Sequence, residues 1–191
     1  MQGFTRNSCI NASLVKGSSV KKYAASLREQ YPTLAEVIDE ILPPKAEVTL
    51  VKCKDSIQLL VVTVDPNTTF NSTSKRFKRI FFWSLRDGVW LPTLRLLHLY
   101  PSFLPLAITD KGCPKNIFNG AQMMAPGVHI IDESLEIGTY VAVSIPEAPA
   151  FFIGRLLQTG ADILAEGRHG AAIEVLHILD DGLWQLKDKY E

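Results

Sequence analysis

Hydrophobic residues recur at helical spacing directly after Ser18. The stripe consists of Val20, Tyr23, Ala24, Leu27 and Tyr31. Because residues three and four apart share one face of a helix, the stripe predicts an amphipathic helix that ends before Pro32. The cations of this segment lie off the stripe, at Lys21, Lys22 and Arg28. The polar side of the predicted helix is therefore basic.

A second helix is predicted to follow closely. Thr33 and Glu36 stand three positions apart, which is the spacing of a capping box at the start of a helix. Apolar residues then continue to Leu42, and Pro43 cannot extend a helix. The sequence thus predicts two helices near its beginning.

Strands and turns are predicted next. Residues 48–53 and 57–64 are rich in β-branched and aliphatic side chains and flank a polar triplet, which predicts a hairpin. A polar loop at 65–79 precedes an aromatic strand at 80–83 and a turn at Asp87 and Gly88. Pro92 suits the first turn of a short helix that ends at Pro101. The loop contains four cations, at Lys75, Arg76, Lys78 and Arg79.

The second half of the chain has the pattern of a small barrel. Five short strands are predicted at 128–131, 139–145, 150–157, 171–178 and 183–186, with short helices at 114–118 and 161–165. Pro101 and Pro105 indicate a boundary between the halves. The expected fold class is α+β, with an N-terminal α/β domain at 1–105 and a C-terminal β-barrel domain at 106–191.

Charge distinguishes the two halves. The formal net charge of the 191 residues is zero. Up to Pro105, however, eight Lys and six Arg against eight acidic residues give +6, while four Lys and two Arg against twelve acidic residues give −6 in the remainder. Such asymmetry indicates that one half faces a polyanion, and the alternative is two solvated surfaces of different composition.

Residues able to carry catalysis or hold a metal are scattered. The four histidines, His98, His129, His169 and His177, lack an acidic or cysteine partner at metal-ligand spacing, and the three cysteines form no Cys-x-x-Cys pair. Cys113 precedes Pro114 and could start a helix, where a thiolate is favoured, but a lone cysteine without a base is usually structural. We therefore expect no enzymatic activity, no catalytic residue, no metal and no cofactor.

The adjacent carboxylates Asp180 and Asp181 also fail to indicate a catalytic pair. Neighbouring side chains in a turn point apart, and Asp181-Gly182 is itself a turn signal. No apolar run approaches about 18 residues and the N-terminus lacks a signal-peptide core, so a cytoplasmic protein in a reducing compartment is expected.

Three segments of the second half resemble the PUA domain, an RNA-binding module of pseudouridine synthases and archaeosine transglycosylases. They are Thr109–Gly112, Asn119–Val128 and Asp181–Trp184. Here Gly112, Gly120 and Gly127 are expected to supply either positive φ or a close backbone approach beside a bound nucleotide. The alternative is that these glycines only form the corners of the barrel.

Further segments are similar to the malignant T-cell-amplified sequence family, whose yeast-type members are called translation machinery-associated proteins. They are residues 92–101, 104–105, 110–112, 14–16, 28–32 and 51–53. The same two-domain unit is similar to the N-terminal part of ligatin. The resemblance implies a PUA-type barrel, binding to the small ribosomal subunit, a role in initiation, reinitiation or recycling, and a separate partner resembling density-regulated protein.

At two places this sequence departs from the family pattern, and the family's features at those places are not carried over to this chain. Residues 65–79 lengthen a hairpin loop that is short in the family, and residues 128–138 lack the usual Ser-Pro-Gly turn. The insertion either adds phosphate contacts or is a solvated loop, and whether residues 128–138 still face RNA stays open.

RNA-binding candidates follow from the basic positions and from the PUA resemblance. They are Lys21, Lys22, Arg28, Lys75, Arg76, Lys78, Arg79 and Arg86 in the first half, and Lys111, Gly120, Ala121 and Gly127 in the second. The expected ligand is ribosomal RNA, with transfer RNA as a further candidate. The alternatives are an RNA-modification enzyme or accessory subunit with a PUA domain, and a protein-protein adaptor whose acidic half binds a basic partner.

Overall fold

A computed structural model describes residues 4–66, 68–71, 74–85 and 88–186 of the chain. These residues form two compact units. The sheet unit combines residues 4–95, as far as they are described, with residues 182–186, and the barrel unit spans Leu96–Asp181. The domain boundary that the sequence predicts at residue 105 stays a prediction.

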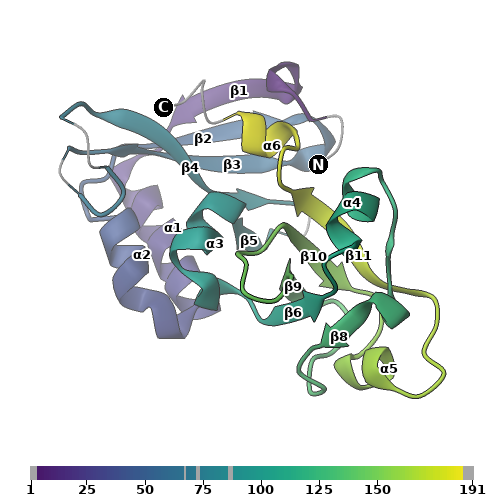
Figure 1. The fold of residues 1–191 in the computed structure, drawn as a ribbon. Coiled ribbons are helices and arrows are strands. Elements are labelled where there is room, and N and C mark those ends of the chain that lie inside the picture. Colours follow the sequence, from purple (N-terminus) through teal and green to yellow (C-terminus); the bar gives the residue numbers. More distant parts are fainter. Residues whose placement is uncertain (1–3, 67, 72–73, 86–87, 187–191) are drawn as a thin grey trace. The chain divides into compact units, whose positions relative to one another are not determined.

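The sheet unit contains a five-stranded antiparallel sheet with the order β1-β2-β3-β4-β5 (Figure 1). The strands are β1 (Cys9–Leu14), β2 (Val48–Cys53), β3 (Gln58–Val64), β4 (Phe77–Ser84) and β5 (Trp90–Pro92). Short 3-10 turns precede β1 (Arg6–Ser8) and join β2 to β3 (Lys54–Ser56). The predicted hairpin and aromatic strand are confirmed, and β1 is an addition that the sequence pattern did not predict.

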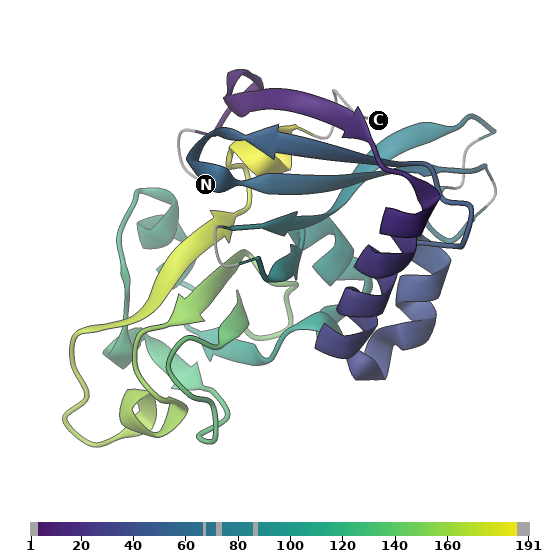
Figure 2. The same ribbon diagram turned by 180° about the vertical axis from the view of Figure 1, so that it is seen from behind.

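Helices α1 (Gly17–Gln30) and α2 (Ala35–Ile41), joined by a 3-10 turn (Pro32–Leu34), cover one face of this sheet (Figure 2). Val20, Ala24 and Leu27 are buried along one stripe of α1, as the helical spacing predicts. The Tyr31 hydroxyl donates a hydrogen bond to the Trp90 carbonyl oxygen over 2.7 Å. The two predicted helices are therefore confirmed, but α2 has Leu34 at its N-cap and no side-chain cap, so the predicted capping box of Thr33 and Glu36 is wrong.

Helix α6 (Gly182–Gln185) lies on the opposite face of the sheet in both views (Figures 1 and 2). The prediction of a strand at 183–186 is wrong. Leu183 and Leu186 are both buried, and their three-residue separation places them on one helical face, a period that short apolar runs do not reveal. The guanidinium of Arg95 lies 3.8 Å from the ring centre of Trp184 and donates to its carbonyl oxygen over 3.2 Å.

The predicted role of Pro92 also needs correction. Pro92 ends β5, opposite Phe82 of β4, and helix α3 (Leu94–Leu99) begins two residues later. An edge strand tolerates proline because its outward side needs no N–H donor. The Pro92 carbonyl oxygen accepts a hydrogen bond from Nε1 of the buried Trp83 over 3.0 Å, which fixes this end of the strand.

The barrel unit is a six-stranded sheet with the order β7-β11-β10-β9-β6-β8, which curls into a nearly closed barrel. Its strands are β6 (Leu106–Thr109), β7 (Met123–Met124), β8 (Val128–Ile130), β9 (Tyr140–Ser144), β10 (Phe152–Leu156) and β11 (Ala171–Ile178). The pairs are antiparallel except for β6 and β9. Four predicted strands are confirmed, and β6 and β7 are additional.

Helices α4 (Cys113–Phe118) and α5 (Gly160–Leu164) confirm the two short helices predicted in this half. Two 3-10 turns accompany them (Pro101–Phe103 and Ala125–Gly127). Phe152, Ile173 and Ile163 belong to the buried core of the barrel. A Cβ on Gly154 would lie 2.4 Å from Ile173, so strand β10 can pass β11 at this point only without a side chain. The α+β fold class is confirmed.

Throughout the residues described, no helix combines the length and apolar character needed to cross a membrane.

Candidate nucleic-acid interface

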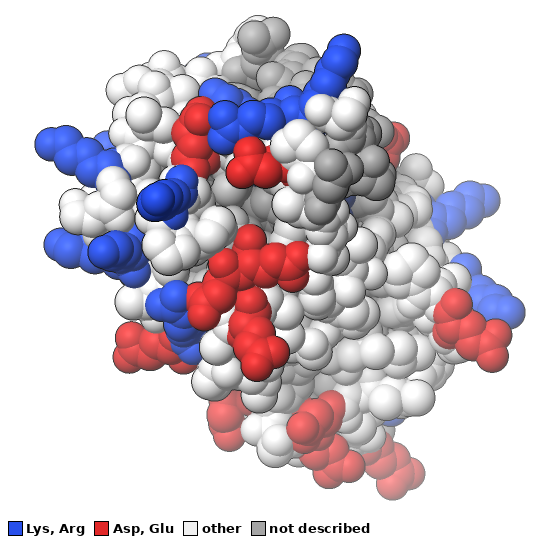
Figure 3. All heavy atoms as spheres, turned by 90° about the vertical axis from the view of Figure 1, so that its left-hand side faces the viewer, with Lys and Arg blue, Asp and Glu red and all other residues white. Residues whose placement is uncertain are grey.

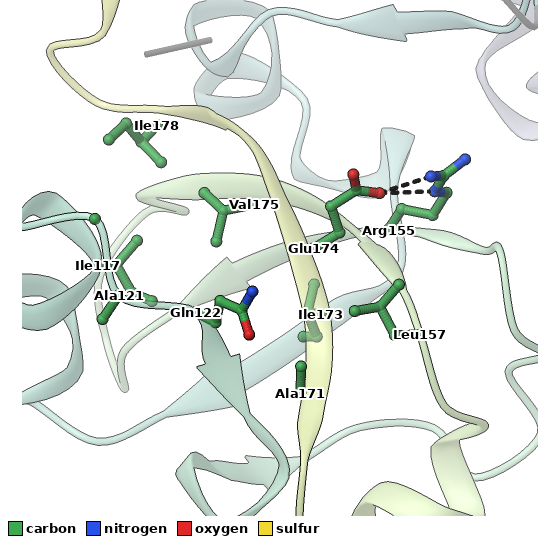
Figure 4. A pocket seen from close by; sticks show the side chains of 11 residues that line it. Ile117, Ala121, Gln122, Arg155, Leu157, Ala171, Ile173, Glu174, Val175 and Ile178 are labelled. Carbon is green, nitrogen blue, oxygen red and sulfur yellow. Dashed lines mark hydrogen bonds and ion pairs between the residues drawn. The ribbon is translucent and has the colours of Figure 1, made fainter.

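A cavity of about 440 Å³ opens between α4, the loop after it and strands β10 and β11 of the barrel unit (Figure 4). Its lining consists of Ile117, Gly120, Ala121, Gln122, Arg155, Leu157, Ala171, Ile173, Glu174, Val175 and Ile178. Small-molecule sites typically occupy 300–1,000 Å³, so the volume suffices for one flat ring system.

The floor of the cavity is apolar and its rim is polar. Ile117, Ile173 and Ile178 are buried beneath it. At the rim, Glu174 Oε2 accepts hydrogen bonds from Arg155 Nε over 3.0 Å and from Arg155 Nη2 over 2.7 Å. Both side chains are 41% exposed. Such a floor suits the face of a ring, and such a rim suits groups that donate or accept hydrogen bonds.

Gly120 shapes the loop that borders the cavity. Its φ of +87° lies in the left-handed region, which glycine enters without steric cost. The Gly120 N–H donates to the Ile117 carbonyl oxygen over 2.9 Å, and the Ala121 N–H donates to that of Asn116 over 3.0 Å. These two bonds form a Schellman motif, which ends α4 and turns the chain so that Ala121 and Gln122 border the cavity.

Asp110 organises the other end of α4. Its Oδ1 accepts hydrogen bonds from the N–H groups of Gly112 over 2.7 Å and Cys113 over 3.0 Å. A Cβ on Gly112 would approach the same oxygen to 3.1 Å. Lys111 is exposed in this turn. Gly112 therefore allows a close approach to the capping carboxylate, and Lys111 presents an ammonium group to solvent.

Gly127 does not line the cavity. Its carbonyl oxygen accepts a hydrogen bond from the Thr109 hydroxyl over 2.6 Å, and a Cβ on Gly127 would lie 3.2 Å from the Met123 methyl carbon. Of the three glycines, Gly120 thus has a positive φ, whereas Gly112 and Gly127 lie close to protein side chains, and a role of any of them beside a nucleotide stays a prediction. Gly127 holds the 3-10 turn before β8 against the barrel.

The cations of α1 differ in their surroundings. Lys21 and Lys22 are exposed near the start of the helix. Arg28 is paired with Asp39 of α2, to which its Nε donates over 2.7 Å. An exposed pair of this kind adds little stability, but it neutralises part of the positive potential at Arg28. The two lysines are consequently the stronger phosphate-binding candidates of this helix.

The cations of the segment 75–79, whose residues 77–79 belong to β4 rather than to the predicted loop, also differ in their surroundings. Arg76 Nε lies 2.7 Å from Asp65 Oδ1, and its Nη2 lies 3.9 Å from Glu47 Oε2. The guanidinium of Arg79 lies 4.9 Å from the centre of the Phe77 ring. Figure 3 shows basic and acidic side chains next to one another on this side of the molecule. Lys75 and Lys78 are exposed, whereas Arg86 lies outside the described residues.

Comparisons with known proteins identify both parts of the chain. Residues 5–101 match the Pre-PUA-like domain, and residues 104–182 match the PUA domain of eIF2D. The chain is 36% identical to the malignant T-cell-amplified sequence 1 homolog of Drosophila melanogaster over 177 residues, which are 91% of this chain and 90% of that protein. It is 32% identical to translation machinery-associated protein 20 of Saccharomyces cerevisiae, covering 95% of each.

The chain belongs to the malignant T-cell-amplified sequence family. This finding confirms the resemblance seen in the sequence. A hypothetical protein from Pyrococcus horikoshii OT3 has the same fold, with a TM-score of 0.66, 22% identity, and coverage of 93% of this chain and 99% of that one. The chain is thus a translation-associated protein of the PUA class.

The histidines of this family member require one correction. His177 is paired with Asp181, whose Oδ2 lies 2.8 Å from its Nδ1, and both side chains are buried. The same oxygen accepts the Ile178 N–H over 2.9 Å. Asp180, at a φ of +66°, reverses the chain and brings Asp181 back onto the end of β11. The His177–Asp181 pair closes this turn. The pairing was not predicted from the sequence, although the two residues are only four positions apart.

Of the three cysteines, Cys53 is buried, and Cys9 and Cys113 are half-buried. Burial, together with the neighbouring Cys9, raises the pKa of Cys53 to about 12. Cys9 and Cys53 face each other on β1 and β2 with their sulfur atoms 3.7 Å apart, although 44 positions separate them in the sequence. Burial likewise raises the pKa of Cys113, although it starts α4 as predicted. Protonated thiols are poor nucleophiles, so these positions favour a structural role.

Most of the residues that line the cavity were not predicted from the sequence. Gln122 lies inside the segment that resembles the PUA domain and could have been predicted. Arg155 and Glu174 lie on strands whose sequence pattern predicts only barrel strands. Only the pairing of β10 with β11 brings Arg155 opposite Glu174. A polar residue within an apolar strand is the signal that would have identified them.

Proposed function

We propose that this chain is a non-enzymatic, cytoplasmic RNA-binding translation factor. It binds the small ribosomal subunit and acts in initiation, reinitiation or recycling together with a partner resembling density-regulated protein. The observation that carries the proposal is the cavity between α4 and β11 in a PUA-class barrel.

The chemistry of the cavity supports an unpaired nucleotide as ligand. Proteins that read single-stranded RNA stack or bury bases against apolar and aromatic surfaces and bond to their edges. The floor around Ile117 and Ile173 supplies the apolar surface. The Gln122 amide and the Glu174 carboxylate supply hydrogen-bonding groups at the rim. Their positions favour recognition of one base rather than of a double helix.

The distribution of charge supports different contributions of the two units to RNA binding. Residues 96–181 contain four basic and ten acidic residues, a formal charge of −6. Phosphate contacts supply much of the affinity for RNA and need cations, so they are expected mostly from the sheet unit. Lys21, Lys22, Lys75 and Lys78 are its exposed candidates. The barrel unit would then contribute base recognition, with Lys111 beside it.

Crosslinking to purified small ribosomal subunits tests the proposal. We expect crosslinks from the cavity rim to unpaired ribosomal RNA nucleotides, and from α1 to nearby phosphates, when photoreactive groups replace Gln122 and Lys22. Crosslinks to ribosomal proteins alone would instead support an adaptor function. If neither photoreactive variant forms a crosslink to the subunit, the proposal is wrong.

The salt dependence of binding tests the cations. Each lysine that meets a single-strand phosphate contributes about 0.7 to the slope of log affinity against log salt. Changing Lys21, Lys22 and Lys78 to alanine is therefore expected to flatten the slope by about 2. Fluorescence anisotropy with labelled single-stranded RNA between low and moderate salt gives the slope.

Arg76→Ala is the matched control for this measurement. It removes one positive charge two residues before Lys78, but Asp65 already pairs with that guanidinium. We expect its slope to stay close to that of the unaltered protein. If the triple variant keeps the original slope, these lysines do not contact phosphate.

A further inference from the structure

The two edges of the five-stranded sheet are protected to different degrees. At one edge, β5 spans three buried residues and ends in Pro92. At the other edge, β1 spans six residues, and all but its first are exposed. Unpaired backbone groups at a sheet edge can pair with a strand of another chain. Natural edge strands are therefore usually protected by charged side chains, by proline, or by a helix or loop that covers them. The sequence of β1, Cys-Ile-Asn-Ala-Ser-Leu, contains neither a charge nor a proline.

The hydrogen-bonding pattern shows which backbone groups of β1 point outward. The Val15 N–H donates to the Val48 carbonyl oxygen over 2.8 Å, and Ser13 and Asn11 lie opposite Leu50 and Lys52. Bonded and non-bonded pairs alternate along an antiparallel ladder. Ser13 and Asn11 therefore bond to β2, whereas the N–H and C=O groups of Ala12 and Leu14 face the edge that no other described strand covers.

The side chains along this edge combine apolar and basic character. Ile10 is 70% exposed and Leu14 is 69% exposed. The charged residues within 9–16 and 48–56 are Lys16, Lys52, Lys54 and Asp55, all exposed, which gives a local charge of +2. An incoming strand would cover both large apolar side chains and would meet this cationic margin.

We propose that β1 accepts an extended, acidic segment of a partner protein as a sixth strand of the sheet. Main-chain bonds to Ala12 and Leu14 provide affinity, and alternate side chains of the segment cover Leu14 and Ile10. Acidic residues on the segment complement Lys16, Lys52 and Lys54. A second copy of this chain is disfavoured, because pairing β1 with β1 would bring two sets of these lysines together.

The test uses the full chain and a capped ten-residue peptide that alternates valine with glutamate. Hydrogen exchange is followed by NMR. With saturating peptide, exchange at the Ala12 and Leu14 amides is expected to slow by about tenfold or more, while Asn11 and Ser13 change little because they already bond to β2. The same peptide with lysine in place of glutamate is expected to bind about tenfold more weakly.

Ala12→Pro removes one outward N–H at a position where an edge strand tolerates proline, and it should abolish peptide binding. Ala12→Val is the matched control, because it keeps the donor and should retain binding. Leu14→Glu changes no backbone group but removes an apolar contact and adds repulsion, so it should also lose binding.

Three results would overturn the proposal. They are unchanged exchange at Ala12 and Leu14 with millimolar peptide, equal binding of the lysine peptide, and a dimer of the chain alone that Ala12→Pro dissociates. The RNA affinity of Ala12→Pro is measured in parallel. It should equal that of the unaltered protein, so failure at β1 is distinguishable from failure of the RNA-binding proposal.

Discussion

Replacing Ala121 with leucine is expected to lower the affinity for single-stranded RNA by about tenfold or more, because one base contributes roughly 1–3 kcal/mol. Ala121 is exposed and lines the cavity between α4 and β11. A leucine side chain there would occupy space that the proposed base needs, and it offers no aromatic ring for stacking. Fluorescence anisotropy with a labelled unstructured RNA measures the change.

Ala161→Leu is the matched control for Ala121→Leu. Ala161 is also an exposed alanine of the barrel unit, on α5, and it does not line the cavity. Both variants should unfold at the temperature of the unaltered protein. Equal RNA affinity in the two variants would show that the cavity does not hold a base.

Replacing Gly182 with alanine is expected to destabilise the fold strongly. The added Cβ would lie 1.4 Å from the Phe4 carbonyl oxygen, and a backbone atom cannot rotate away as a side chain can. Either α6 or the segment around Phe4 must shift, which would uncover Leu183, Leu186 and Phe4. We expect a loss of about 3 kcal/mol or more in the free energy of unfolding. The unfolding temperature should fall by roughly 6–12 °C.

Gly17→Ala provides the comparison. Gly17 is the first residue of α1, and nothing lies within 4 Å of the Cβ that alanine would add there. Its free energy of unfolding should stay within about 0.5 kcal/mol of the original. Thermal unfolding followed by circular dichroism measures both variants. Similar stability of the two would mean that α6 does not pack against Phe4 as described.

Local periodicity explains which elements could be predicted. Helix α1 buries one stripe, so Val20, Ala24 and Leu27 recur at helical spacing in the sequence. Strand β1 has no such signal, because both of its faces are exposed and burial imposes no alternation. The helix at Gly182–Gln185 is too short for its period to be distinguished from that of a strand.

The residues of the candidate site could be predicted only in part, because many of them meet only in the folded chain. Gly120 and Ala121 are adjacent and lie within a recognisable segment, so the sequence identified this border of the cavity. Arg155 and Glu174 are 19 residues apart and meet only because β10 and β11 pair. Likewise, the partners of Arg28 and Arg76 are set by tertiary structure, so composition alone overestimates the free positive charge.

The chain path through the sheet unit has a consequence for synthesis. Helix α6 lies beyond the whole barrel unit in the sequence, yet its Gly182 packs against Phe4 and its Trp184 contacts Arg95. During translation, even the last strand of this sheet, β5, ends at Pro92, which is 90 residues before this helix begins at Gly182. The barrel can therefore fold while its neighbour is incomplete, and the earliest-made sheet is the last to acquire its full set of contacts.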